Sequence, residues 1–383
     1  MIAEAESENL ANFLSPLYDL EERPIPKISS NFATPFEVIN KKFKPYKNNL
    51  NCYHINAGSI PKHYDEIVRL LIELGVDILA VCETFICDKT PKIFYEIPGY
   101  TFIHKDRNMK CRGGTGLYIK NGIQFKEIKL CKDIIQPEVC FVEVKCQNSK
   151  IAIGVVYKSP LISYTEYSVL TEVLAPIITG YEHHLILGDF NIDQLKPDSS
   201  PCKYFRDHVL VPYDLSQMIT EPTRIAKDSC TLIDLLLVSY PENVKVVGVA
   251  DIPAIADHRL IYCSYALKKP KFKPVIIHKR KMANFNIDNF KHDIDMAAWG
   301  NLDVFDQNDL DNKVTVFENI YRDIIDQHCP KVEIRVTHPS SSSWRTPEIK
   351  EMQNDRDRYY SKFKQMKKKQ KTEEKKTTIL RLN

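Results

Sequence analysis

The chain has 383 residues, of which 43% are hydrophobic and 27% charged, and its formal net charge is +3. These values are typical of globular proteins and exclude a disordered chain, and 12 glycines are too few for a collagen-like or glycine-rich repeat. The length allows two or three domains, or one large α/β domain with appendages. Eleven of the glycines lie between Gly58 and Gly248. Because glycine permits tight turns, we expect one turn-rich folded domain in the middle of the chain.

The first segment, residues 1–49, is punctuated by proline and has no clear hydrophobic period, so we expect a loosely ordered arm. From residue 50 onward, short apolar runs rich in β-branched residues alternate with helical patterns. These patterns predict ten strands, at 50–56, 77–85, 100–106, 115–122, 139–146, 150–159, 184–191, 231–239, 243–251 and 258–267, and three helices, at 63–75, 165–179 and 202–209. No helix separates the strands between residues 100 and 157. They must form hairpins, which favours mixed sheets over a doubly wound parallel sheet.

The last segment, residues 268–383, begins with the basic, proline-punctuated stretch KKPKFKP. Apolar residues at spacings of three and four then predict amphipathic helices at 284–302 and 310–329. After the spacer THPSSSS, Thr346 caps a last helix and Pro347 takes its first position. Residues 345–383 carry a net charge of +7, which leaves −4 for the other 344 residues. Any affinity for polyanions is therefore expected mainly in the tail and in local patches.

The eleven cysteines include no C-x-x-C pair, and several lie in apolar runs. We expect reduced, buried thiols rather than a zinc site or a disulfide framework. The acidic N-terminus lacks the basic start and apolar core of a signal peptide, and no apolar run approaches the ~18 residues of a membrane span. These features predict an intracellular, soluble protein without a membrane partner. They do not indicate an oligomeric state.

Polar side chains stand where several predicted strands end. Asn56, Glu83 and Tyr157 close three of them, and Asp189 and Asn191 follow a fourth in the motif GDFN. Sheets present ligand-binding groups from the loops beyond their strand ends, so these side chains are candidates for one site. A single strand-terminal Asp or Asn more often caps a helix or makes an Asx turn. Glu83 follows five apolar residues, where a carboxylate is costly unless it is solvated, paired or bound to a metal.

A second pair of polar residues lies further along the chain. Asp234 interrupts the apolar run TLIDLLLV, and a buried carboxylate there needs a partner. His258, directly after Asp257, is the candidate. A carboxylate bonded to one imidazole nitrogen fixes the tautomer and supports the charged ring, leaving the other nitrogen to face a phosphate or a leaving group. For His258 alone, the alternative is a structural histidine with satisfied hydrogen bonds.

The order of these signals resembles the endonuclease/exonuclease/phosphatase superfamily over about residues 50–267. The signals are, in chain order, Asn56, Glu83, VVY, GDFN, the ID of the apolar run and the DH pair. Within it, the chain is similar to the apurinic-type endonuclease domain of non-LTR retrotransposons of the jockey/CR1 kind. The resemblance is carried by INAGSIPKHYDEI, DILAVCETF, GYTFIHKDR with RGGTGLYIK, EPTR before TLIDLLLVS, and WRTPEIKEMQNDRDRYYSKFK. It implies an α/β fold, a four-layer α/β sandwich of two mixed β-sheets flanked by helices, with a C-terminal helical appendage.

The resemblance also implies an activity, a DNA endonuclease that nicks double-stranded target DNA for integration by target-primed reverse transcription. The implied cofactor is Mg²⁺, with Mn²⁺ as the alternative ion. Glu83 would hold this metal ion, helped by Asn56 and Asp257. Hydrolysis of a phosphodiester needs an activated water and positive charge at the phosphoryl oxygens.

The implied catalytic roles follow the motif residues. Asp189 would handle the proton of the attacking water and Asn191 would orient it. Tyr157 would donate to a phosphate oxygen. His258, steadied by Asp234, would stabilise charge on the pentavalent phosphorus.

Two positions depart from the family pattern. Ala256 stands before the Asp-His pair, where many relatives have serine, so one hydrogen bond of that loop is lost. Gly58 occupies a position that holds a carboxylate in cellular repair endonucleases. This second difference disfavours a repair enzyme, although retroelement nucleases commonly lack this acid.

The candidate DNA contacts are basic residues of the loop between His104 and Gly114, together with two single positions: Lys105, Arg107, Arg112, Lys158 and Thr223. Basic side chains interleaved with glycine can approach a phosphate backbone closely, and a solvated surface loop is the alternative. The lysine-rich tail is a candidate contact for the element's RNA, or a nuclear address, and the expected location is nuclear.

The chain contains no paired-Asp polymerase motif, so we expect an open reading frame truncated before the reverse transcriptase. Two alternative functions stay open. One is a phosphoesterase of the same fold that acts on a phospholipid or an inositol phosphate. The other is a catalytically silent DNA-binding relic.

Overall fold

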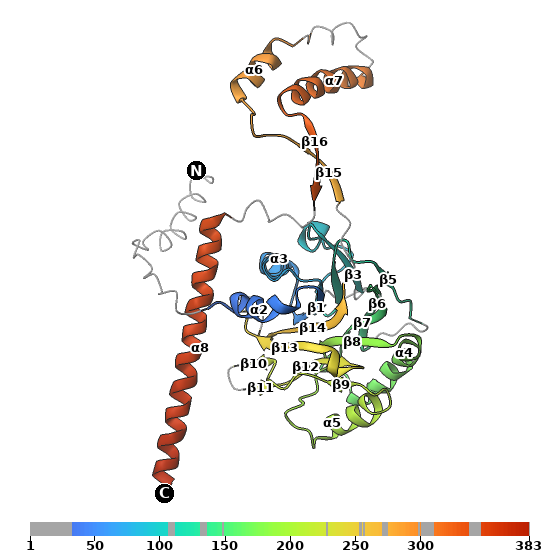
Figure 1. Ribbon diagram of the computed structural model, residues 1–383, viewed down its shortest axis with the longest axis vertical. Coiled ribbons are helices and arrows are strands. Elements are labelled where there is room, and N and C mark those ends of the chain that lie inside the picture. Colours follow the sequence, from blue (N-terminus) through green and yellow to red (C-terminus); the bar gives the residue numbers. More distant parts are fainter. Residues whose placement is uncertain are drawn as a thin grey trace, which may run out of the picture.

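The computed structural model describes residues 33–105, 112–130, 136–147, 149–226, 229–252, 255, 257–269, 275–297, 299, 310–336 and 346–382. Two six-stranded sheets face each other, and helices cover their outer faces (Figure 1). This arrangement confirms the predicted four-layer α/β sandwich.

The first sheet has the order β13-β14-β1-β2-β4-β3. Its strands are β1 (Asn49–Asn56), β2 (Ile78–Cys82), β3 (Tyr100–Lys105), β4 (Thr115–Lys120), β13 (Val244–Ala250) and β14 (Leu260–Lys268). β1 and β2 are parallel, whereas the other neighbours are antiparallel. The sheet is therefore mixed, as the hairpin pattern predicted.

The second sheet has the order β5-β6-β7-β8-β12-β9. Its strands are β5 (Phe125–Glu127), β6 (Glu138–Lys145), β7 (Lys150–Tyr157), β8 (His183–Asp189), β9 (Ser216–Gln217) and β12 (Asp234–Val238). Here β7 and β8 form the parallel pair. A short separate hairpin, β10 (Arg224–Ile225) with β11 (Cys230–Thr231), lies between β9 and β12 in the chain.

Helices flank both sheets. The α-helices of this part of the chain are α2 (Pro35–Phe43), α3 (Tyr64–Glu73), α4 (Tyr167–Gly180) and α5 (Ser200–Phe205), and α5 continues into a π-helical turn, η5 (Arg206–Leu210). The 3₁₀ turns are η1 (Lys44–Tyr46), η2 (Pro61–His63), η3 (Lys92–Phe94), η4 (Tyr164–Glu166) and η6 (Pro241–Asn243). One apolar core lies between the sheets and extends under α4 and α5, and a second lies between the first sheet and α2 with α3.

Strand β1 shows how the sequence builds these two cores. Leu50 and Cys52 point into the core between the sheets, while Tyr53 and Ile55 point into the core under the helices. Side chains alternate between the two faces of a strand, and both faces are covered here, which explains the nearly continuous apolar run. The run ends at Asn56, where the strand reaches the edge of the core.

Part of the expected loosely ordered arm, residues 1–49, is helical instead, because α2 covers Pro35–Phe43. Thr34 and Glu37 form a reciprocal capping box at its start, and Phe36, Ile39 and Phe43 are buried in the core above the first sheet. Burial of side chains of this size contributes roughly 1.5–3 kcal/mol each. The helix has only nine residues and lies among prolines, which hid its period; residues 1–32 lie outside the described part of the chain.

The C-terminal segment contains α6 (Ile287–Asp295), α7 (Leu310–His328) and α8 (Pro347–Leu382), which confirms the three helices predicted there. It also contains an antiparallel pair, β15 (Val275–Arg280) with β16 (Lys331–Val336), that was not predicted. The two strands are separated by about fifty residues of sequence, and local hydrophobic periodicity does not predict a pairing over such a distance.

The nine cysteines in the described ranges have free thiols, and seven of them are buried. Within the described ranges, the helices are too short or too polar for any of them to cross a bilayer.

Candidate active site

The polar strand-end residues meet at one edge of the sandwich. In the first sheet, Asn56 at the end of β1 lies in register with Cys82, directly before Glu83. In the second sheet, Tyr157 and Asp189 are paired at the ends of β7 and β8. The antiparallel strand β12 begins with Asp234 opposite Asp189. Both parallel pairs therefore present their carboxyl ends at the same edge, which is where sequence analysis placed a site.

Asn56 joins the two sheets at this edge. Its Nδ2 donates to Oε1 of Glu83 at 3.0 Å and to Oδ2 of Asp189 at 2.9 Å. The backbone N–H of Gly58 donates to Oδ1 of Asn56 at 3.1 Å, which fixes the amide plane. One buried side chain thus holds the two carboxylates in a common hydrogen-bond network.

Glu83 is half-buried and has a left-handed backbone, with φ of +53°. Such a conformation is unfavourable for a residue with a side chain and is often found at functional sites. Its Oε1 also accepts a hydrogen bond from the Tyr157 hydroxyl at 3.0 Å. The hydroxyl expected to face a phosphate therefore holds the carboxylate in this structure, and Glu83 raises the pKa of Tyr157, in addition to the larger effect of burial.

Asp189 is 1% exposed, at the end of β8. Gly188 before it lets the strands approach closely, because a Cβ there would lie 1.9 Å from the carbonyl oxygen of Val156. Burial, followed by repulsion from Asp234, raises the pKa of Asp189 to about 7. A carboxylate with such a pKa is suited to accept a proton near neutral pH.

Asn191 lies in the turn after β8. Its backbone N–H donates to Oδ1 of Asp189 at 3.0 Å, and its Nδ2 donates to the carbonyl of Lys158 at 2.7 Å. Its φ of +49° is again left-handed. The backbone of Asn191 therefore contacts the Asp189 carboxylate, while its side-chain amide is fixed by the Lys158 carbonyl.

Asp234 and His258 form the predicted carboxylate–imidazole pair, with Oδ2 and Nδ1 2.8 Å apart. Burial alone would lower the pKa of His258, but the Asp234 carboxylate outweighs it, helped by Asp189 and Asp257, and the pKa rises to about 9. Burial likewise opposes ionisation of Asp234, yet its contact with His258 keeps the pKa of this carboxyl below its usual range. The imidazole is thus held in its charged form.

His54 is a site residue that sequence analysis missed. It lies in β1, is 0% exposed, and places Nε2 3.1 Å from Oδ1 of Asp234. Its Nδ1 lies 3.2 Å from the carbonyl oxygen of Ala80. Asp234 is therefore held between two imidazoles. The only signal was a polar residue inside a buried strand, two positions before Asn56.

His258 directs its second nitrogen into the site. Nε2 lies 4.0 Å from Oδ2 of Asp189 and 4.0 Å from Oδ1 of Asp257, beyond hydrogen-bond range. Asp257, predicted as a metal ligand, accepts a hydrogen bond from Nε of Arg224 at 2.7 Å. Both groups of this pair are partly exposed, at 39% and 43%.

The metal-ligand set combines carboxylate and amide oxygens. Mg²⁺ prefers such oxygen ligands and is usually bound through one or two carboxylates, so the Glu83 carboxylate fits it. Asn56 turns its Nδ2 toward Glu83, and its Oδ1 accepts the Gly58 N–H and has a second lone pair for a metal ion. Ligand atoms of Asp189, Asp234 and His258 also lie within 4.8 Å of one another. Within this second group, Asp234 and His258 are hydrogen-bonded directly to each other.

Two predicted DNA contacts are corrected by the structure. Lys158 is 3% exposed, and its Nζ donates to the carbonyls of Ser159 and Ile162. Thr223 is 0% exposed, and its hydroxyl oxygen accepts the backbone N–H of Asp234 at 2.9 Å. Each side chain supports the loops of the site from inside instead of facing solvent.

The basic loop is described only at its ends. Lys105 is half-buried at the end of β3, and Arg112 is exposed. Arg107 and the rest of residues 106–111 lie outside the described residues, as does Ala256. β4 begins at Thr115, opposite Cys82 of β2, and β3 ends at Lys105, opposite Thr115. Both ends of the loop therefore lie at the same edge of the sheet as the polar cluster.

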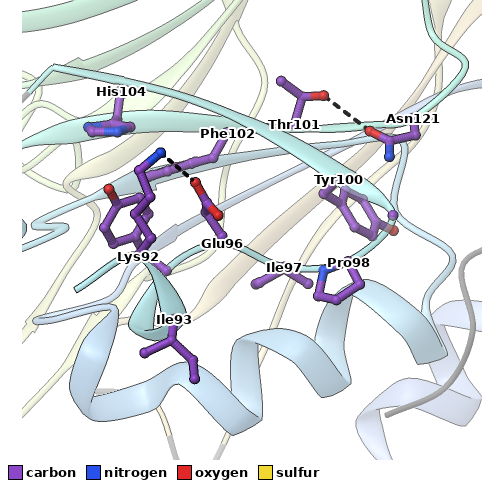
Figure 2. A pocket seen from close by; sticks show the side chains of 12 residues that line it. Lys92, Ile93, Glu96, Ile97, Pro98, Tyr100, Thr101, Phe102, His104 and Asn121 are labelled. Atoms are coloured by element: carbon purple, nitrogen blue, oxygen red, sulfur yellow. Dashed lines mark hydrogen bonds and ion pairs between the residues drawn. The ribbon is translucent and has the colours of Figure 1, made fainter. Parts of the chain in front are cut away.

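A cavity of about 760 Å³ lies elsewhere, between η3 and β3 (Figure 2). Figure 2 shows Phe102 and His104 side by side on its wall, and their rings are stacked with centroids 4.8 Å apart. None of the strand-end polar residues lines this cavity. The candidate site is therefore defined by the polar cluster.

A buried carboxylate with a pKa of about 7, a charged imidazole and a carboxylate that fits a metal ion are groups that hydrolysis of a phosphoester requires. The chain belongs to the endonuclease/exonuclease/phosphatase family, whose model matches residues 49–258. Enzymes of this family typically depend on a divalent metal ion.

Several solved structures are similar to this chain. The 3′ phosphatase NExo from Neisseria, bound to a product DNA hairpin, is 19% identical, with a TM-score of 0.46, over 56% of this chain and 99% of that one. The endonuclease domain of TRAS1, a telomere-specific non-LTR retrotransposon, is 11% identical, with a TM-score of 0.47, over 57% and 99%. An AP endonuclease from Archaeoglobus fulgidus is 14% identical, with a TM-score of 0.46, over 57% and 100%. No curated protein sequence matches the chain.

Proposed function

We propose that this protein is a Mg²⁺-dependent DNA endonuclease that nicks double-stranded target DNA for integration of a non-LTR retrotransposon. The observation that carries the proposal is the Asn56 amide, which bonds to both Glu83 and Asp189. It places the expected metal ligand and the expected proton acceptor in one network. The retrotransposon assignment rests on the motif resemblance, from INAGSIPKHYDEI to the C-terminal WRTPEIKEM segment.

In this proposal, Asp189 accepts a proton from the attacking water, which the neighbouring Asn191 orients. The charged His258 donates through Nε2 to a phosphoryl oxygen as negative charge develops there. Asp234, held by His54 on its other oxygen, fixes the orientation of that imidazole. In these roles, Asp189 takes up the proton of the water and His258 stabilises the negative charge that develops on the phosphoryl oxygen.

Glu83 and Asn56 would hold the metal ion, with Asp257 as a third ligand after exchange of its Arg224 partner. A bound Mg²⁺, or Mn²⁺ in its place, would polarise the phosphoryl oxygen and stabilise the leaving oxygen. The Tyr157 hydroxyl donates to Glu83 and keeps its carboxylate in place.

Nucleic-acid contacts complete the proposal. Lys105 and Arg112 flank a loop that leaves the sheet at the catalytic edge, and we assign this loop, including Arg107, to the DNA backbone. Residues 362–376 contain eight lysines, which we assign to the element's RNA and to nuclear targeting.

The proposal predicts that the purified full chain converts supercoiled plasmid to the open-circular form with Mg²⁺ and not with EDTA. Because Glu83 would bind the metal ion, we expect the Glu83→Gln substitution to lower the nicking rate roughly 100-fold or more. Gel analysis of the plasmid forms measures both effects. Retardation of DNA without nicking in Mg²⁺ supports the silent DNA-binding relic instead. Phosphate release from a phospholipid or inositol phosphate without DNA cleavage supports the other phosphoesterase.

The pKa values predict a bell-shaped dependence of nicking on pH. Asp189 must be ionised to accept a proton, so the rate rises as pH increases through about 7. His258 must be charged, so the rate falls as pH increases through about 9. Because the two groups interact, the limbs report apparent values of the pair. Single-turnover rates at constant ionic strength between pH 5 and pH 10, at about half-unit steps, measure the profile. A rate that rises without limit above pH 9 contradicts the role of His258.

A further inference from the structure

The middle of helix α3 is buried on all sides. Five consecutive residues, 67–71, are buried, although five positions span more than a full helical turn. A helix that covers a sheet normally turns a polar, solvated face outward. Here the face away from the sheet carries Arg69, which is 0% exposed, and that face lies beside α8 (Figure 1).

Arg69 is covered by residues from a remote part of the chain. Its Nη2 lies 2.8 Å from Oδ2 of Asp357, which is also 0% exposed, and donates to Oδ1 of Asn354 at 3.2 Å. The guanidinium also lies 4.4 Å from the ring centre of Phe36 in α2. Arg69 also lies 3.7 Å from Glu66 and 3.5 Å from Glu73 of its own helix, and Asp357 accepts hydrogen bonds from the neighbouring Arg356. The Arg69–Asp357 pair is the shortest of the ion pairs of Arg69 and joins two groups excluded from water, 288 positions apart, so losing either partner leaves a buried charge with weaker pairing.

The rim of this contact has complementary charge. Arg356 donates through Nη1 and Nη2 to the two carboxylate oxygens of Glu66, at 2.7 and 3.3 Å. Arg358 lies 3.7 Å from Glu37 of α2. Arginines of α8 thus face carboxylates of α2 and α3, which favours one register of the helix over others.

We propose that α8 docks on α2 and α3 in solution, within the same chain, as an integral helix of the nuclease unit centred on Arg69 and Asp357. The charge of α8 is divided accordingly. Residues 346–358 contain three Lys or Arg and four Asp or Glu, whereas residues 359–383 contain nine and two. The docked half is nearly neutral, and docking holds the basic distal half, a rod of roughly 1.5 Å per residue, in a fixed direction from the catalytic domain.

Hydrogen–deuterium exchange of the full chain tests this docking without reference to catalysis. In the wild type, amides of residues 353–361 exchange about tenfold or more slowly than those of residues 366–380, because undocking must precede their exchange. Asp357→Arg places two positive charges together and brings both halves to the same rate. Asp355→Asn is the matched control, since Asp355 pairs with Arg358 of its own helix, and it keeps the difference. Equal exchange of the two halves in the wild type overturns the proposal.

A second variant guards against general unfolding. Replacing both partners, Arg69→Met with Asp357→Leu, exchanges the ion pair for apolar side chains of similar length and retains the slow exchange. If the fold is intact, the Asp357→Arg protein nicks plasmid at a rate within twofold of the wild type. If neither the wild type nor any variant nicks plasmid, the proposed activity is contradicted, but the docking of α8 is not. Light scattering gives the mass of one chain. A mass of two chains, with slow exchange that is lost on dilution, contradicts docking within the same chain.

Discussion

Replacing Asp189 with asparagine is expected to lower the single-turnover nicking rate by roughly 1,000-fold. The variant keeps the size of the side chain, but its amide cannot accept a proton and has a single acceptor oxygen. One of the two hydrogen bonds that Asp189 accepts, from Nδ2 of Asn56 or from the backbone N–H of Asn191, is therefore lost. The expected loss exceeds what one hydrogen bond contributes, so it reports mainly proton transfer. Rates measured on supercoiled plasmid with saturating enzyme separate this effect from weaker DNA binding.

The same substitution is expected to leave stability unchanged or to increase it. Burial raises the pKa of Asp189 to about 7 in the folded state. Above the pKa that this group has in the unfolded chain, its ionisation therefore lowers the free energy of unfolding. The neutral amide removes this cost at neutral pH, which offsets the one hydrogen bond that the amide cannot accept, and the midpoint of thermal unfolding does not fall. Asp193→Asn in the following loop serves as the control, with a near-normal rate expected. An Asp189→Asn protein with more than a tenth of wild-type activity refutes the assignment of the base.

Replacing His258 with alanine is expected to lower the rate by about 100- to 1,000-fold, the range for loss of a group that stabilises transition-state charge. The pKa of His258 is raised to about 9, so the imidazole carries its charge at neutral pH and points Nε2 into the site. Loss of the ring also leaves the buried Asp234 with one imidazole instead of two. Activity and thermal unfolding must therefore be measured together.

His208→Ala is the matched control for this substitution, because His208 is exposed on η5 and lies outside the polar cluster. We expect it to retain nearly full activity. In the His258→Ala protein, the limb of the pH profile near 9 disappears. The lower limb persists but moves to higher pH, because the positive charge of His258 lowers the pKa of Asp189. Full activity, or an unchanged upper limb, would assign the positive charge to another group.

Much of the candidate site was predictable because its residues stand at abrupt changes in a local pattern. Asn56, Glu83 and Asp189 end apolar runs, and Asp234 interrupts one. Parallel strands in a sheet align their carboxyl ends, which explains why Asn56 and Glu83 lie together in the first sheet. The packing of the two sheets, which places Asp189 and Asp234 at the same edge, is a property of the tertiary structure. His54 was not found because its partner lies 180 positions away and its own position looks like an ordinary strand interior.

Exposure was less predictable than position. Lys158 and Thr223 were expected at a DNA surface, yet both are buried and bond to backbone groups. A residue type states which contacts a side chain can make, whereas the surrounding loops decide whether solvent or backbone supplies them. The helix α2 was missed for a related reason. Its apolar residues are too few to predict a helix on their own, and their role is evident only from their packing against the first sheet.

The sequence by itself determined the alternation of strands, the mixed sheets, the helices of the C-terminal segment and the chemical groups of the catalytic edge. These follow from periodicity and from polar residues in apolar runs, which are local properties. Only the tertiary structure decided the partners of Asp234, the burial of Lys158 and the contact of Arg69 with Asp357. Their free energies depend on distance and on exclusion from water between segments far apart in the chain, and no local pattern records either quantity.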